Sequence, residues 1–189
     1  MKPLSSSQRG YSLVELAVTV AILSVLMVAG LLGVQGILTS GKVNDQIKTV
    51  AIVSATANAL FASSSTSGVT QTQMLNLGAW DASKASNGNL TSSFGSFETI
   101  APNAAAIGEM AANTGFVYKI SSVPQAACAK LANGISGVVY ALHVTGASSV
   151  APADWSASAK PPGSANISLT TLANACNTNT SDFYLAIKP

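Results

Sequence analysis

The sequence predicts an α+β fold in which one long N-terminal helix is followed by a head of strands and short helices. No proline occurs between Pro3 and Pro102, so nothing forces a break in a helix that begins near the N-terminus. That helix starts with a long apolar segment and continues with amphipathic spacing. The C-terminal half instead alternates short strand-like and helix-like runs.

The long helix is expected from residue 12 to about residue 63. Its first half is apolar on all sides, which is typical of a helix in lipid or in a tightly packed bundle. In its second half, apolar residues recur at steps of three, four or seven and form one face: Val43, Ile47, Val50, Ala57 and Phe61. Polar residues lie elsewhere on the surface: Lys42, Asp45, Lys48 and Asn58. We therefore expect the second half to pack on the head.

Within the head, residues 68–100 are predicted to be a loop with short helical or strand pieces. Three strands are expected at 116–120, 138–144 and 182–187. Three short helices are expected at 102–113, with Pro102 near the first turn, at 124–133, closed by Gly134, and at 168–176, capped by Ser168. Residues 145–165 are rich in Ser, Ala, Pro and Gly and are predicted to form an exposed loop.

Charge is scarce in this chain. Charged residues make up 8% of it, against about 25% in typical soluble domains, and the net charge is +2. Without Lys2 and Arg9, both in residues 1–10, basic and acidic side chains would balance. Because no basic patch is present, phosphate-driven nucleic-acid binding is not expected. A near-neutral surface favours self-association instead.

The two cysteines, Cys128 and Cys176, both lie in the C-terminal half. An exported head would keep a disulfide between them, because such bonds persist in oxidising compartments. The alternative is a pair of free, buried thiols. A metal site is disfavoured, since His143 is the only histidine and no Cys-x-x-Cys occurs.

Catalytic chemistry has little support in the sequence. His143 lies inside a predicted strand, which favours a core or surface role over a catalytic one. The carboxylates Glu98, Glu109, Asp154 and Asp182 show no paired spacing, and no Gly-rich phosphate loop occurs. Trp155 is expected to pack on the head, with an exposed contact role as the alternative. We therefore expect no enzyme activity, no cofactor and no metal.

The N-terminal stretch from Arg9 through Gly10 and Tyr11 to Glu15 leads directly into the apolar segment, which has no further charge before Lys42. A cleaved signal peptide would have a shorter apolar run of about 7–15 residues. A plain membrane anchor fits the length of about 20 residues. It does not explain a carboxylate, expensive in hydrocarbon, placed five residues after Gly10.

A basic leader, a glycine, an aromatic or apolar residue and a glutamate five residues past the glycine resemble the N-terminus of type IV prepilins. The resemblance implies cleavage between Gly10 and Tyr11 by a prepilin peptidase and N-methylation of Tyr11. It also implies that Glu15 neutralises the new amine of a neighbouring subunit during assembly, since two charges enter an apolar core more cheaply as a pair. Lys2 and Arg9 would hold the leader on the cytoplasmic side.

The order of elements and the two C-terminal cysteines resemble the head of type IVb pilins, whose disulfide-bounded region carries much of the exposed surface. The resemblance implies the type IV pilin fold, with the helix packed on an antiparallel sheet. It also implies a leader at 1–10, a transmembrane and assembly half of the helix at 11–40, an amphipathic half at 41–63 and a globular head at 64–189. The chain departs from type IVa pilins, which usually have a proline in the membrane half of the helix.

The function implied is that of a pilus subunit that polymerises into a surface filament for attachment, conjugation or related contact. Its partners would be copies of itself, the peptidase, the pilus assembly machinery and the inner membrane before assembly, and its final location the extracellular pilus. One alternative is a minor pilin or secretion pseudopilin that primes a short fibre. Another is a membrane-anchored binding module that never polymerises.

Gly30, Gly33 and Gly36 interrupt the apolar half of the helix, each at a cost of up to about 1 kcal/mol in helix propensity. Small residues favour close helix packing in membranes. The same glycines also suit a point where the helix unwinds in a filament, and the two interpretations are compatible.

Overall fold

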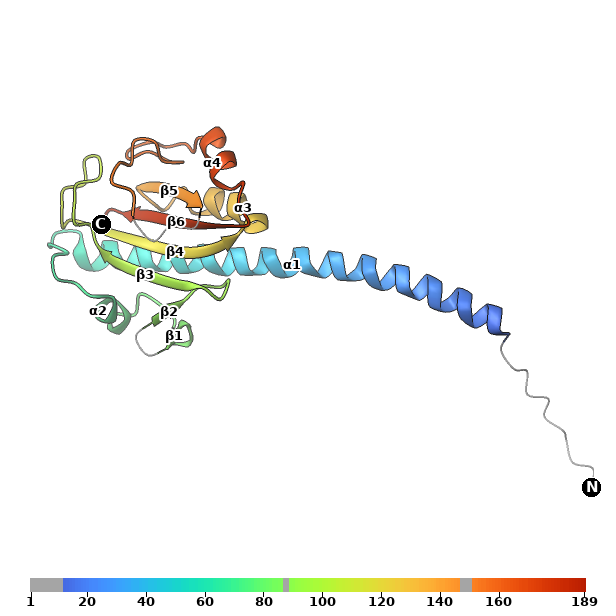
Figure 1. The fold of residues 1–189 in the computed structure, drawn as a ribbon. Coiled ribbons are helices and arrows are strands. Elements are labelled where there is room, and N and C mark those ends of the chain that lie inside the picture. The colour runs from blue at the N-terminus through green and yellow to red at the C-terminus, as the bar shows by residue number, and fades with distance from the viewer. Residues whose placement is uncertain (1–11, 87–88, 147–150) are drawn as a thin grey trace, which may run out of the picture. The chain divides into compact units, whose positions relative to one another are not determined.

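The structure is a computed structural model that describes residues 12–86, 89–146 and 151–189. The described residues fall into two compact units, one that ends at residue 38 and one that begins at residue 39. Helix α1 (Leu13–Phe61) begins in the first unit and ends in the second (Figure 1). The predicted continuous helix over residues 12–63 is thus confirmed to within two residues at its C-terminal end.

The second unit is built on a six-stranded sheet in which every neighbouring pair is antiparallel. Its strands are β1 (Ala85–Ser86), β2 (Asn89–Thr91), β3 (Phe97–Pro102), β4 (Phe116–Pro124), β5 (Ala141–Gly146) and β6 (Thr180–Ile187). Their order is β1-β2-β3-β4-β6-β5, so the C-terminal strand β6 lies between β4 and β5. The three strands predicted from the sequence are β4, β5 and β6, with β5 shifted toward the C-terminus and β4 extended.

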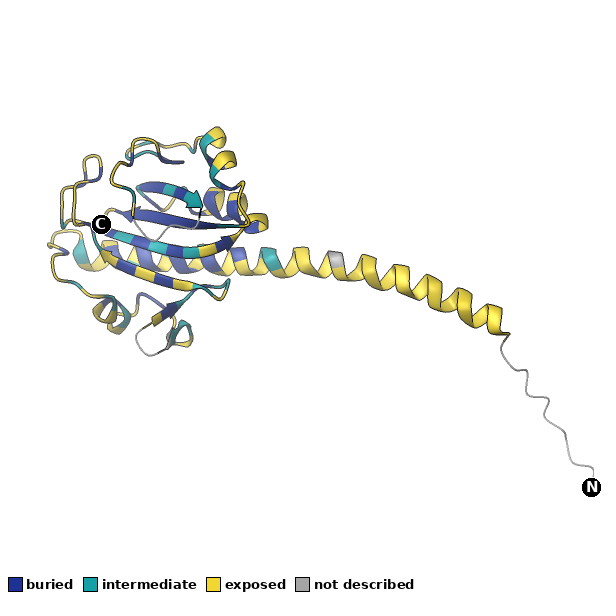
Figure 2. Ribbon diagram, in the orientation of Figure 1, coloured by how far each residue is buried: buried dark blue, intermediate teal, exposed yellow. Residues whose placement is uncertain are grey.

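The main core lies between the sheet and the part of α1 that belongs to the second unit. From this part of the helix, Val43, Val50 and Ala57 are buried in the core, as the amphipathic pattern predicts, and Val53 is buried with them. Figure 2 shows buried segments along this part of α1, which lies beside the sheet. Ile47 and Phe61 are partly buried and pack on the same core. A smaller cluster is formed by Ile107, Met110, Ala141, Trp155, Tyr184 and Ala186.

Short helices surround the sheet. Helix α2 (Gln71–Asn76) starts with a capping box in which Thr70 and Gln73 satisfy each other's backbone N–H groups. A 3₁₀ turn, η1, spans Ala82–Lys84. Helix α3 (Gln125–Ile135) follows β4, and α4 (Leu169–Ala175) begins after Ser168, whose hydroxyl accepts from the Thr171 N–H. The predicted helix at 168–176 and its cap are therefore confirmed.

The helix predicted at residues 102–113 is wrong. Pro102 ends strand β3, and the alanine-rich residues that follow form the connection between β3 and β4. The Asn103 side chain organises this connection, donating to the carbonyls of Ala105 and Ala111 and accepting from the N–H groups of Thr114 and Gly115. Strand pairing on both sides overrides the helix propensity of alanine here.

The helix predicted at residues 124–133 is present as α3, but the prediction that Gly134 closes it is wrong. The helix continues to Ile135, and its C-terminal cap is Ser136. A Cβ atom on Gly134 would lie 2.2 Å from Ile47 Cδ1 of α1. This glycine therefore lets two helices approach each other, rather than supplying a left-handed turn.

The loop predicted as exposed over residues 145–165 is exposed only in part; residues 147–150 lie outside the described part of the chain. Trp155 is 6% exposed, and Ser158, Ala159 and Lys160 are also buried. Lys160 pairs with Leu142 of β5 through two backbone hydrogen bonds of 2.9 Å. Trp155 thus packs on the head, as expected, and the exposed-contact alternative is wrong.

Candidate functional site

The part of α1 that belongs to the first unit carries most of the exposed large hydrophobic side chains in the described structure. Its leucine, valine, isoleucine and methionine side chains are more than half exposed over residues 13–38, wherever they are described (Figure 2). The helix is long and apolar enough to cross a bilayer. Isolated proteins rarely expose a contiguous apolar patch of this size, so the segment requires lipid or other chains around it.

Glu15 is the one acidic residue in the first turn of α1 and is exposed. The first-turn position suits a carboxylate, because the helix N-terminus carries partial positive charge. The predicted cleavage site, Gly10 and Tyr11, lies outside the described residues. A Cβ atom added at Gly30, Gly33 or Gly36 would meet no neighbouring atom within 4 Å, so there is space beside these glycines for another chain.

Inside the second unit, α1 is joined to the sheet by a buried polar cluster centred on Glu98 of β3. The Gln46 side-chain amide donates to Glu98 Oε1 at 2.5 Å, and the Tyr118 hydroxyl donates to Glu98 Oε2 at 2.5 Å. Gln46 in turn accepts from the Ser93 N–H at 2.9 Å, and Tyr118 accepts from Trp80 Nε1 at 3.4 Å. Two chains of donors therefore converge on Glu98, an arrangement that suits an ionised carboxylate.

Burial raises the pKa of the Glu98 carboxyl, against the hydrogen bonds from Tyr118 and Gln46 and the charge of Lys84, which lower it. Lys84 donates from Nζ to Thr49 of α1 at 2.7 Å and to Ser93 at 3.1 Å. The cluster thereby fixes the position of the helix on the sheet through directed bonds, in addition to the apolar core.

The disulfide joins Cys128 of α3 to Cys176, the residue that follows α4, with their Cα atoms 5.8 Å apart. The predicted pairing is present, and the alternative of free thiols does not hold. The bridge links α3 to the C-terminal end of α4 and so closes the part of the chain that includes β5 and α4. It thereby defines a disulfide-bounded part of the head.

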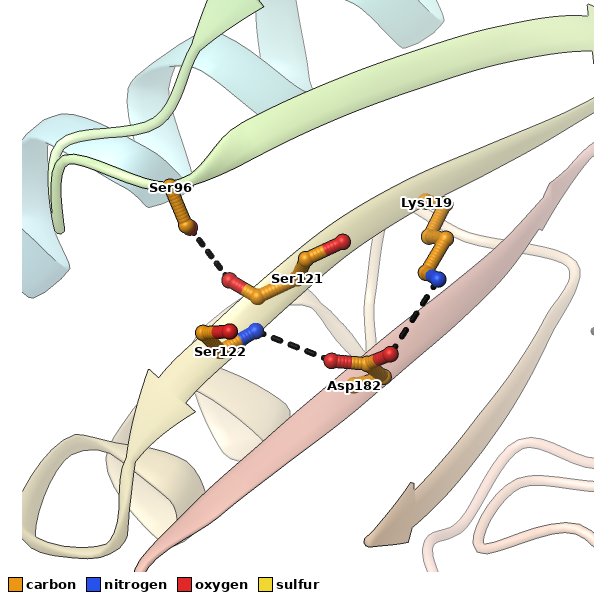
Figure 3. Close-up of polar contacts among 5 residues, drawn as sticks. All are labelled: Ser96, Lys119, Ser121, Ser122 and Asp182. Carbon is orange, nitrogen blue, oxygen red and sulfur yellow. Dashed lines mark hydrogen bonds and ion pairs between the residues drawn. The ribbon is translucent and has the colours of Figure 1, made fainter. Parts of the chain in front are cut away.

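Next to the bridge, β4 bulges between Ile120 and Val123, and Ser122 has a positive φ of 52°. Asp182 of β6 accepts the Ser122 N–H at 2.9 Å and pairs with Lys119 at 3.1 Å (Figure 3). The Ser96 hydroxyl donates to the carbonyl of Ser121 from the other side. These contacts hold a strained bulge in the strand that leads into α3.

Lys160 is a buried cation that the sequence did not mark. Its ammonium donates to the carbonyls of Ser136 and Val139, each at 2.6 Å. Since Ser136 caps α3, the charge neutralises the negative end of that helix. Burial lowers the pKa of Lys160.

His143 of β5 is half-buried, and its Nδ1 lies 3.1 Å from the Ser158 hydroxyl. Its ring lies edge-on to Trp155, with ring centroids 6.3 Å apart. Burial lowers the pKa of this histidine. No carboxylate of the described residues bonds to it, and no group of metal-ligating side chains occurs among them. The geometry is that of a packed surface residue.

Comparison with known proteins adds two findings. The family described as "Prokaryotic N-terminal methylation motif" matches residues 5–31. Among solved structures, TcpA, a type IV pilin from Vibrio cholerae El Tor biotype, is 18% identical with a TM-score of 0.56, over 77% of this chain and 98% of that one. The type IVb pilin from Salmonella typhi is 18% identical with a TM-score of 0.52, over 77% and 99%. Curated protein sequences gave no match.

At this level of identity the structural likeness concerns the fold, and the motif match concerns the N-terminus. Both agree with the exposed apolar helix, the antiparallel sheet and the disulfide-bounded part of the head. The chain therefore combines the type IV pilin fold, in a form shared with a type IVb pilin, with a prepilin-type N-terminal methylation motif.

Proposed function

We propose that this chain is the structural subunit of a type IVb-like pilus, which polymerises through its N-terminal helix into a surface filament. The filament serves attachment, conjugation or related contact. The observation that carries the proposal is the exposed apolar half of α1, most of which lies inside the N-terminal methylation motif matched over residues 5–31. One such surface is suited in turn to a bilayer before assembly and to neighbouring helices after it.

Processing precedes assembly in this account. A prepilin peptidase cuts between Gly10 and Tyr11 in the inner membrane and methylates the new amine. This leaves residues 11–40 as the membrane and assembly segment, residues 41–63 as the amphipathic segment, and residues 64–189 as the head. The assembly machinery then moves the subunit from the membrane into the extracellular filament.

Glu15 directs the addition of each subunit. Cleavage leaves a positive amine on Tyr11, and the carboxylate of Glu15 in one copy neutralises the amine of its neighbour. Two opposite charges enter an apolar filament core at far lower cost than either one alone. The four-residue separation of Tyr11 and Glu15 makes the contact staggered between copies, so it can repeat along the filament.

The test compares Glu15→Ala with Glu15→Asp in cells that assemble the wild-type chain. We expect Glu15→Ala to be cleaved as usual but to yield few filaments in the sheared fraction. Glu15→Asp retains the charge and is expected to assemble better than Glu15→Ala. Normal filaments from Glu15→Ala would refute the pairing. Retention of uncleaved wild-type chain in the membrane would instead favour an anchored module that does not polymerise.

A further inference from the structure

Along the stretch of α1 that packs on the head, the helix has a second face that points away from the head. We name it the outer seam, and it consists of Gly41, Asp45, Lys48, Ile52, Ala55 and Ala59. All six are exposed, whereas Val43, Val50, Val53 and Ala57 of the same stretch are buried. The apolar residue Ile52 is 51% exposed. This part of the helix therefore has one face covered by its own head and one face that no described residue of the chain covers.

The spacing of the outer seam keeps its residues in one line along the helix, so this face can pack along another helix. Its members follow one another at steps of four, three, four, three and four residues. This is the seven-residue repeat in which apolar residues face a neighbouring helix. The alanines would let another backbone approach closely, and Ile52 would supply apolar area.

Two charges of opposite sign occupy adjacent positions of this seam, Asp45 and Lys48. The only ion pair among the described residues is Lys119–Asp182, so Asp45 and Lys48 form no ion pair with each other or with another described residue. Polar residues in such a seam fix the register of the partner at some cost in stability. Parallel copies in register would place like charge against like charge, whereas staggered copies would place Asp45 against Lys48.

We propose that the outer seam binds the α1 helix of a second copy, and that an ion pair between Asp45 of one copy and Lys48 of the next sets the stagger. The inference rests on the proposed function, which makes the helices parallel because every copy leaves the membrane with the same orientation. A staggered contact of this kind uses different residues on its two sides. It therefore repeats without closing, as a helical filament requires.

The experiment uses the charge reversals Asp45→Lys and Lys48→Asp in the full chain, alone and expressed together in one cell. Each reversal alone places like charges in the seam of every copy, and we expect at least about a tenfold loss of sheared filaments. Together they restore opposite charges between copies, but not within either chain. Mixed filaments that contain both chains, distinguished by intact mass, are therefore expected at a level near that of the wild type.

Glu109→Lys is the matched control, because it makes the same charge change as Asp45→Lys at an exposed residue outside α1. It is expected to assemble as the wild type does. If co-expression yields no more filament than the two single variants together, or if either reversal alone assembles normally, the ion pair between copies is refuted. Failure of the wild type itself to assemble would instead refute the proposed function and this inference together.

A second measurement covers the case in which a charge reversal reduces the amount of chain in the cell. The neutral variants Asp45→Asn and Lys48→Gln, with their double variant, form a double-mutant cycle on filament yield. Coupled charges predict that the double variant loses less than the product of the two single losses. Losses that simply multiply would refute the pairing.

Discussion

The side-chain amide of Gln46 donates to the carboxylate of Glu98 across 2.5 Å, between two side chains that are 0% and 1% exposed. Gln46 lies on the long helix and Glu98 on strand β3, 52 residues further along the chain. A buried charge is costly unless donors surround it, and Tyr118 supplies the second donor. The contact therefore gives the head one preferred position on the helix.

Replacement of Gln46 by Ala is expected to lower the free energy of unfolding of the head by about 2–3 kcal/mol, because it removes a donor to a buried charged group. Asn58→Ala is the control, as an exposed position on the same helix. Urea unfolding in detergent, followed by the fluorescence of the buried Trp80 and Trp155, measures both. Equal effects of the two replacements would contradict the role of Gln46.

The raised pKa of Glu98 predicts a pH dependence of stability. A carboxyl with a higher pKa in the folded chain binds its proton more readily when folded. Its contribution to the free energy of unfolding therefore grows as the pH falls through the folded pKa. It is complete below the ordinary value of 4.5. Glu98→Gln is expected to remove this part of the slope, so the difference between variant and wild type isolates it. The same slope in both proteins would refute the assignment.

The close contact of Gly134 with Ile47 predicts that Gly134→Ala destabilises the head by about 1–2 kcal/mol through overpacking, although alanine favours helix. Ile47→Ala in the same chain is expected to relieve the clash, giving a non-additive double variant. Gly41→Ala is the control, since its added methyl would meet no neighbour within 4 Å. Thermal unfolding of the wild type, the two single variants, the double variant and the control tests this, and a stabilising Gly134→Ala would contradict it.

The bridge between Cys128 and Cys176 closes a loop with a sequence separation of 48 residues. On the chain-entropy account, replacing both cysteines by serine is expected to lower the free energy of unfolding by roughly 4 kcal/mol. Chemical denaturation of the wild type with and without reductant provides the companion measurement. Unchanged stability in the serine variant would show that the bridge does not constrain the unfolded chain.

Asp182 and Lys119 form one ion pair, yet their replacements should differ in effect. Asp182→Ala also removes the acceptor for the Ser122 N–H, at a residue with positive φ, and is expected to cost about 1–3 kcal/mol. Lys119→Ala removes a partly exposed partner and its contact with the ring of Tyr184, and should cost about 1 kcal/mol or less. Denaturant titrations of the two variants decide this, and equal losses would assign the effect to the ion pair alone.

The sequence predicted those parts of the fold that depend on local patterns. An apolar run without proline followed by amphipathic spacing suffices for α1, and Ser168 suffices to start α4. Residues 102–113 were misassigned because strand pairing and the Asn103 side chain, which act across the chain, outweigh alanine propensity. Gly134 was misassigned because a glycine needed for close approach has the same local appearance as one that ends a helix.

The candidate site likewise has features that local sequence predicts and features that depend on contacts between distant residues. The exposed apolar half of α1 and the position of Glu15 follow from the order of residues alone. Gln46 and Glu98 carry no sequence signal of their contact, because burial of a carboxylate is decided by donors that lie far away in the chain. Lys160 is similar, since its partners are backbone carbonyls that only the fold brings together.

The most direct test of the account is the intact mass and N-terminal sequence of the chain sheared from its cells. We predict a chain that begins at methylated Tyr11 and is recovered in the filament fraction. Its mass should be about two units below the reduced form, as expected for one closed bridge. A chain that still begins at Met1 and stays in the membrane fraction would contradict the account.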